Sequence, residues 1–198
     1  DVAPSRGLGD VYKRQMYHTV KAVKTSKNIP ITVVPIMGAA NVRTPERDSL
    51  DLSKELAYAY GGTYHYIYAP LFVNSEEVRD SLEQEPNIKG CLELARNADI
   101  ILTSVGSIVY KSWKSYLSTR DLYNLEKKGA IGHIGGHFYD MEGNEVITPF
   151  VNKMIGLGIE DIKNTENVIC VAGLEMKAEA ILGAVRGGYI NTLITDEE

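Results

Sequence analysis

The alternation of short apolar runs with amphipathic segments is the feature that most restricts the fold of this chain. Strands rich in apolar and β-branched residues are predicted at 31–37, 99–103 and 167–173. Apolar residues at helical spacing predict helices over 49–60 and 86–98. Strands that are apolar at nearly every position are typical of parallel sheets buried on both faces. The pattern therefore predicts an α/β fold with a doubly wound, mostly parallel sheet and helices on both faces.

Three further segments carry local signals. Ser75 followed by acidic residues predicts a helix N-cap. The glycine-rich segment 129–142 predicts one strand, followed by a turn at 143–144. An amphipathic helix is predicted near the C-terminus, with Met176 and Val185 on its inner face.

Composition and charge exclude several classes of protein. The 198 residues are 44% hydrophobic and 24% charged, which fits one globular domain. The net charge of −5 and the lack of clustered basic residues make the chain itself a poor partner for DNA. Cys91 and Cys170 lie far apart and without CxxC spacing, so we expect buried, reduced thiols in a cytoplasmic protein. No apolar run is long enough to predict a membrane span.

The first fifteen residues, DVAPSRGLGDVYKRQ, differ from the rest of the chain. They show no period and resemble a translated sequencing-adapter read-through. We therefore predict that residues 1–15 are a non-native leader and that residues 16–198 form the domain. A genuine flexible leader is the alternative.

Candidate ligand contacts follow from where the predicted strands end. In parallel sheets ligands bind beyond the carboxyl ends of the strands. Gly106 and Ser107 follow one strand, where a glycine permits close backbone approach and a hydroxyl can donate to phosphate. Gly173 ends another strand directly before a helix start, which favours anions. Lys177 lies in the first turn of that helix, where the helix dipole favours an acidic residue. A cation at this position is explained if it reaches an anion bound at the same helix start. A plain turn and a surface lysine are the alternatives.

The segment from Gly132 to His137 holds three glycines and two histidines. His133 and His137 are four residues apart, which on a strand places them on one face. A zinc site would need a further ligand, and none is evident. Polar pocket walls or solvated histidines are the preferred interpretation, so no metal is predicted. No Ser–His–Asp or paired-carboxylate arrangement can be assembled, and no catalytic residue or cofactor is predicted.

Several segments, in order along the chain, resemble one family. VICVAGLEMKAEAILGAVRGGYINTLITDEE, at 168–198, resembles the C-terminal signature of the sugar-binding domain of SorC/DeoR-type transcriptional regulators. KKGAIGHIGGHFYDMEGNEV, at 127–146, resembles the glycine-rich stretch of that family. ADIILTSVGS, at 98–107, and YIYAPLFVNSEEVRDSL, at 66–82, resemble two further family segments.

The resemblance implies a fold similar to sugar-phosphate isomerases, glucosamine-phosphate deaminases and CoA transferases. It implies a phosphorylated sugar as effector, a homo-oligomer (dimer or tetramer), and DNA contact only through an N-terminal helix-turn-helix outside this sequence. The residues that match the ligand-binding positions of the family are Gly106, Ser107, Gly132, His133 and Lys177.

Departures from the family affect the expected contacts. The family usually has aspartate at His133 and glycine at Leu174, and its first strand and a Gly-Arg-Thr loop would lie just before Met16. An effector-binding module is the leading hypothesis. A sugar-phosphate isomerase or deaminase, with His133 or Asp196 as base, and a fragment that serves only oligomerisation are the alternatives.

Overall fold

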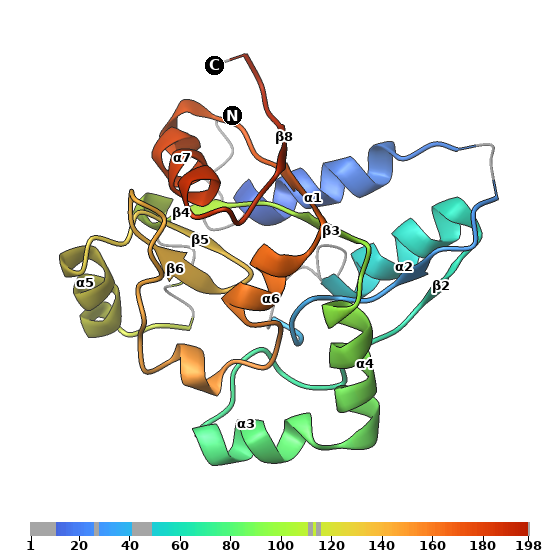
Figure 1. Ribbon diagram of the computed structural model, residues 1–198, viewed down its shortest axis with the longest axis horizontal. Coiled ribbons are helices and arrows are strands. Elements are labelled where there is room, and N and C mark those ends of the chain that lie inside the picture. The colour runs from blue at the N-terminus through green and yellow to red at the C-terminus, as the bar shows by residue number, and fades with distance from the viewer. Residues whose placement is uncertain (1–10, 26–27, 41–48, 111–112, 114–115, 198) are drawn as a thin grey trace, which may run out of the picture.

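The computed structural model describes residues 11–25, 28–40, 49–110, 113 and 116–197. Its strands form three small sheets with helices packed around them (Figure 1). Two sheets are parallel and the third is antiparallel. The first parallel sheet pairs β1 (Thr32–Val33) with β2 (Thr63–Tyr64). The second parallel sheet has β7 (Asn167–Val171) in the middle, between β3 (Ile100–Thr103) and β8 (Thr192–Ile194). The antiparallel sheet has β5 (Gly132–Ile134) in the middle, between β4 (Gly106–Ser107) and β6 (His137–Tyr139).

Helices connect most of these strands. They are α1 (Val11–Ala22), α2 (Ser49–Tyr60), α3 (Glu76–Glu83), α4 (Pro86–Arg96), α5 (Thr119–Lys127), α6 (Ile159–Asn164) and α7 (Ala178–Arg186). Short 3₁₀ turns are η3 (Ile108–Tyr110), η5 (Val151–Lys153) and η6 (Glu175–Lys177). The Ser75 side chain accepts a hydrogen bond from the Val78 N–H, which confirms the predicted cap of α3. In the described residues, no helix has the length and apolar character that a membrane crossing requires.

The largest core cluster lies where β3 and β7 meet the helices beside them. Ile101 on β3 and Val168 on β7 are buried there with Ile162 of α6. Cys91 and Cys170 are both free and buried, as predicted. A second cluster, which contains Trp113 and Phe138, packs against α5 through Leu122 and Leu125. The first cluster fixes β3 next to β7, so that the loops that follow these two strands come together.

The predicted α/β class with parallel strands is confirmed, and two local predictions are wrong. The segment predicted as one glycine-rich strand is the hairpin β5–β6. Gly135 and Gly136 form its turn with φ of 56° and 95°, a left-handed pair that suits a two-residue hairpin. Met176 and Val185 are each 50% exposed, although helical spacing predicts both inside. Met176 belongs to the 3₁₀ turn before α7, where side chains project in a different register.

Candidate ligand-binding site

The candidate site lies at the carboxyl ends of β3 and β7. These strands pair in parallel, with Thr103 opposite Cys170, so the loops that follow them share one edge of the sheet. The first loop leads into β4, and the second leads through Gly173 into η6. Strand β4 pairs with β5, with Gly106 opposite His133. The structure thus brings all six predicted ligand-binding residues to one region.

Lys177, the last residue of η6, is the most unusual side chain in this region. It is 1% exposed, and its Nζ donates hydrogen bonds to the Val105 carbonyl oxygen at 2.9 Å and to Gln15 Oε1 at 2.5 Å. Both acceptors are neutral. Among the described residues, Lys177 forms no ion pair with a carboxylate. Burial away from water lowers the pKa of Lys177 to about 8, and the interaction with Cys170 acts in the opposite direction.

Gln15 fills the space in front of this ammonium group. Its Oε1 also accepts from Ser104 Oγ at 3.3 Å, and its Nε2 donates to the Gly173 carbonyl oxygen at 3.3 Å. One carboxamide therefore bridges the loop after β3, the loop after β7 and Lys177. Sequence reasoning missed this residue, because it lies in the predicted leader and carries no motif. Helix α1 begins at Val11, so the described structure includes the end of that segment.

His133 forms a buried floor beneath the first loop. It is 2% exposed, and its ring packs edge-on against Trp113 with centroids 5.2 Å apart. Burial, and to a lesser degree the charge of Lys177, lowers the pKa of His133 to about 3, so this imidazole is neutral at physiological pH. A Cβ at Gly106 would lie 2.1 Å from His133 Nε2. Gly106 therefore permits the histidine to pack directly under the backbone.

The neighbouring pair, Ser107 opposite Gly132, is also buried. The Ser107 hydroxyl accepts from the Val109 N–H at 3.4 Å. A Cβ at Gly132 would lie 2.8 Å from the Cβ of Ala180, so this glycine lets β5 approach α7 closely. In this structure Gly106, Gly132 and His133 thus have clear packing roles.

The loop after β7 is occupied by an acidic side chain from the C-terminal segment. Asp196 Oδ2 accepts the Leu174 N–H at 2.8 Å, and a Cβ at Gly173 would lie 2.3 Å from the same oxygen. Leu174 has a φ of 85°, a conformation that favours glycine. An anion that bound at this N–H would have to displace the Asp196 carboxylate.

The zinc alternative gains no support from the geometry. His137 lies on β6, opposite Ile134, and both of its ring nitrogens are used: Nδ1 lies 2.8 Å from Glu145 Oε1, and Nε2 lies 2.9 Å from the Leu157 carbonyl oxygen. Across the described part of the chain, no group of three or more histidine, cysteine or acidic side chains is placed to hold a metal ion.

Comparison with known proteins identifies the family. Residues 8–198 match the Sugar-bind family of sugar-binding domains. The chain belongs to this family. It is 27% identical to the Escherichia coli transcriptional regulator YjhU over 195 residues, which cover 96% of this chain and 58% of that protein. It is 35% identical to the E. coli transcriptional regulator LsrR over 138 residues, which cover 67% of this chain and 44% of that protein.

The fold agrees with this assignment. The full-length sorbitol operon regulator SorC from Klebsiella pneumoniae superimposes with a TM-score of 0.88 and 23% identity, over 94% of this chain and 62% of that one. The chain spans about half the length of the two curated relatives. The match to a family of sugar-binding domains supports the prediction of an effector-binding module.

Proposed function

We propose that this sugar-binding domain recognises a phosphorylated sugar, and that the phosphate binds at Lys177. The observation that carries the proposal is the Lys177 ammonium group. It is buried, and its hydrogen-bond acceptors among the described residues, Val105 O and Gln15 Oε1, are both neutral. A buried charge without a counter-charge is unfavourable unless something of opposite charge binds beside it. A phosphate supplies that charge and accepts charge-assisted hydrogen bonds, which are stronger than those to a carboxamide.

The groups around Lys177 suit a phosphate that replaces the Gln15 carboxamide. Ser104 Oγ already donates toward the Gln15 oxygen, so the same hydroxyl can donate to a phosphate oxygen. The Leu174 N–H, now bonded to Asp196, is a further donor at the same edge of the sheet. Selectivity for one sugar would come from polar groups in these loops. His133 is buried and neutral, so it would act through packing, or through one ring nitrogen, rather than through charge.

We further propose that this chain serves a DNA-binding regulator, as the relatives named above are transcriptional regulators. The net charge of −5 makes direct DNA contact by this domain unfavourable, so a helix-turn-helix elsewhere in the full protein would bind the operator. Sugar phosphate would then act by binding one state of a homo-oligomer more tightly than another.

Thermal denaturation against a panel of sugar phosphates, with the matching free sugars and inorganic phosphate, tests the proposal. A ligand at about 100 times its Kd adds about 2.7 kcal/mol, which raises Tm by several degrees in a domain of this size. We expect one phosphorylated sugar to give this shift and its free sugar to give none. Lys177→Met should abolish the shift, whereas Lys89→Met, at an exposed lysine on α4, should preserve it. A shift that survives Lys177→Met would refute Lys177 as the phosphate ligand.

A further inference from the structure

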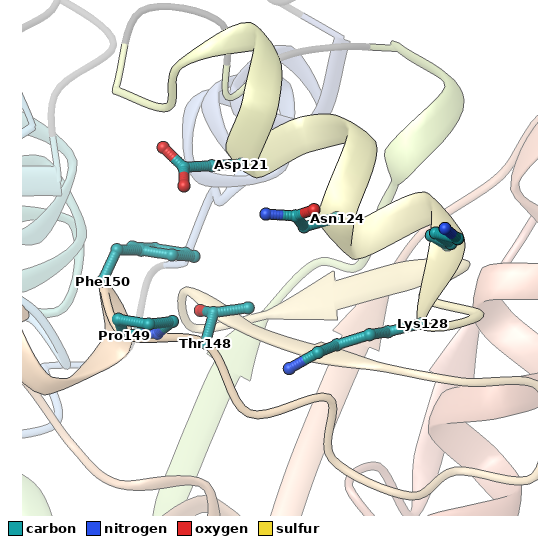
Figure 2. Close-up of a pocket in the computed structure, with 7 residues that line it drawn as sticks. Asp121, Asn124, Lys128, Thr148, Pro149 and Phe150 are labelled. Carbon is teal, nitrogen blue, oxygen red and sulfur yellow. The ribbon is translucent and has the colours of Figure 1, made fainter.

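A second pocket lies between α5 and the segment 148–150, and it shares no residue with the site around Lys177. Its volume is about 340 Å³, which falls in the size range of small-molecule sites. Figure 2 shows Asp121 and Asn124 on α5 facing Thr148 and Phe150 across the pocket. In Figure 1, α5 lies well apart from α7, the helix that follows Lys177. The proposed sugar site does not account for this pocket.

The Thr148 hydroxyl is the reason to consider the pocket a ligand site. Thr148 is 7% exposed, and its Oγ1 has no hydrogen-bond partner among the described residues. A buried hydroxyl without a partner is unfavourable, and most such groups in folded proteins are paired. In Figure 2 this side chain rises into the space below Asn124. A polar atom of a ligand in the pocket would give the hydroxyl a partner.

The lining limits the charge and shape of that ligand. Pro149 and Phe150 form an apolar wall. The Lys128 ammonium donates to the Ile147 carbonyl oxygen at 3.0 Å, which leaves two of its three protons for other acceptors. The neighbouring Lys127 ammonium lies over the Tyr123 ring, 5.9 Å from its centroid, and so contributes mainly its stem.

The carboxylate of Asp121 also lines the pocket. Asp121 accepts from the Ser118 N–H and hydroxyl as part of the cap of α5, so its carboxyl group is held in place there. One ammonium group, two neutral polar side chains and a nearby carboxylate favour a singly charged anion over a phosphate dianion. The rings of Phe150 and Pro149 favour an apolar body on that anion.

We propose that this pocket binds a small organic carboxylate, with the carboxylate on Lys128 and Thr148 and the hydrocarbon part against Phe150 and Pro149. The probe is benzoate, titrated into the ¹⁵N-labelled protein and followed by amide chemical shifts. We expect saturable shifts at Asn124, Thr148 and Phe150, with a Kd on the order of millimolar for so small a ligand. Benzyl alcohol, which lacks the charge, and phenyl phosphate, which is doubly charged, should bind more weakly.

Thr148→Val separates a ligand contact from a structural role. Because the hydroxyl has no partner in the described part of the chain, the variant should be at least as stable as the parent. Its benzoate Kd should rise about tenfold, the effect of one hydrogen bond to an ionised group. Lys128→Met should weaken benzoate similarly, and Lys177→Met should leave it unchanged. Three results would each overturn the proposal: chemical shifts that are absent or do not saturate, a benzoate Kd that is unchanged in Thr148→Val, or tighter binding of benzyl alcohol than of benzoate. None of these results bears on the sugar site.

Discussion

The buried Lys177 charge should make the stability of the ligand-free domain rise steeply in mildly alkaline solution. Its pKa is about 8 in the folded protein and 10.5 in its ordinary state. Between these values the unfolded chain holds a proton that the folded chain has released, so a higher pH favours the folded state. At pH 7 both states are protonated, and burial of the charge destabilises the fold by about 3 kcal/mol. At pH 10 less than about 1 kcal/mol of that penalty remains.

Urea denaturation of the parent and of Lys177→Met at pH 7 and pH 10 measures this effect. Methionine keeps most of the apolar stem and removes the charge. The hydrogen bonds that it loses, to Val105 O and Gln15 Oε1, involve groups that do not titrate, so they cancel when the two pH values are compared. Between pH 7 and pH 10 the parent should gain ~2.5 kcal/mol relative to the variant.

Lys89→Met, at an exposed lysine, provides the control, since its free energy of unfolding should follow that of the parent at both pH values. Tyrosines and Cys170 also titrate in alkali, but they are present in all three proteins. If the free energies of unfolding of the parent and of Lys177→Met change by the same amount between pH 7 and pH 10, the ammonium group of Lys177 is not held in a poorly solvated environment. The reasoning behind the phosphate site would then lose its main support.

Three substitutions test the surrounding structure. Leu174→Gly should stabilise the domain by about 1 kcal/mol in urea denaturation, because glycine relieves the φ of 85° at some entropic cost; a loss of stability would refute strain at this residue. Gly106→Ala should destabilise it by about 2 kcal/mol, because the new Cβ would lie 2.1 Å from His133 Nε2; unchanged stability would contradict this packing. Gln15→Ala should tighten inorganic phosphate binding several-fold by calorimetry, whereas weaker binding would make Gln15 a ligand contact.

The sequence was sufficient to predict where in the fold the candidate site lies, but not how the side chains in it are oriented. Because β3 and β7 read as buried parallel strands, Gly106 and Lys177 were expected at one edge of the sheet, and the structure places them there. The orientation of His133 could not be inferred, because it depends on aromatic neighbours such as Trp113 that are distant in sequence. The approach of Gln15 depends on how α1 packs beside β7, which no local pattern encodes.

The predictions for the glycine-rich segment and for Met176 were wrong for the same reason, because a local pattern of residue types does not determine the backbone conformation. A pair of glycines such as Gly135–Gly136 is compatible with a strand or with a turn, and only the pairing of the flanking residues decides between them. Helical spacing predicted Met176 inside because it was counted as part of α7, but the chain first makes a 3₁₀ turn at η6. That turn places Lys177 under the loop after β3. The 3₁₀ backbone that interrupts the helical spacing of apolar residues therefore also positions a residue of the candidate site.

The same irregular turn links ligand binding to stability. The unfavourable burial of the Lys177 ammonium group is incurred when the domain folds, before any ligand arrives, so an anion that binds there encounters an already desolvated charge. A phosphate would restore favourable charge pairing, raise the pKa of Lys177 and recover part of the ~3 kcal/mol penalty. A neutral sugar, which can only replace the Gln15 carboxamide with another neutral acceptor, recovers none of it. In the proposed site, a charged ligand is therefore favoured over a neutral one through the free energy of folding as well as through direct contact.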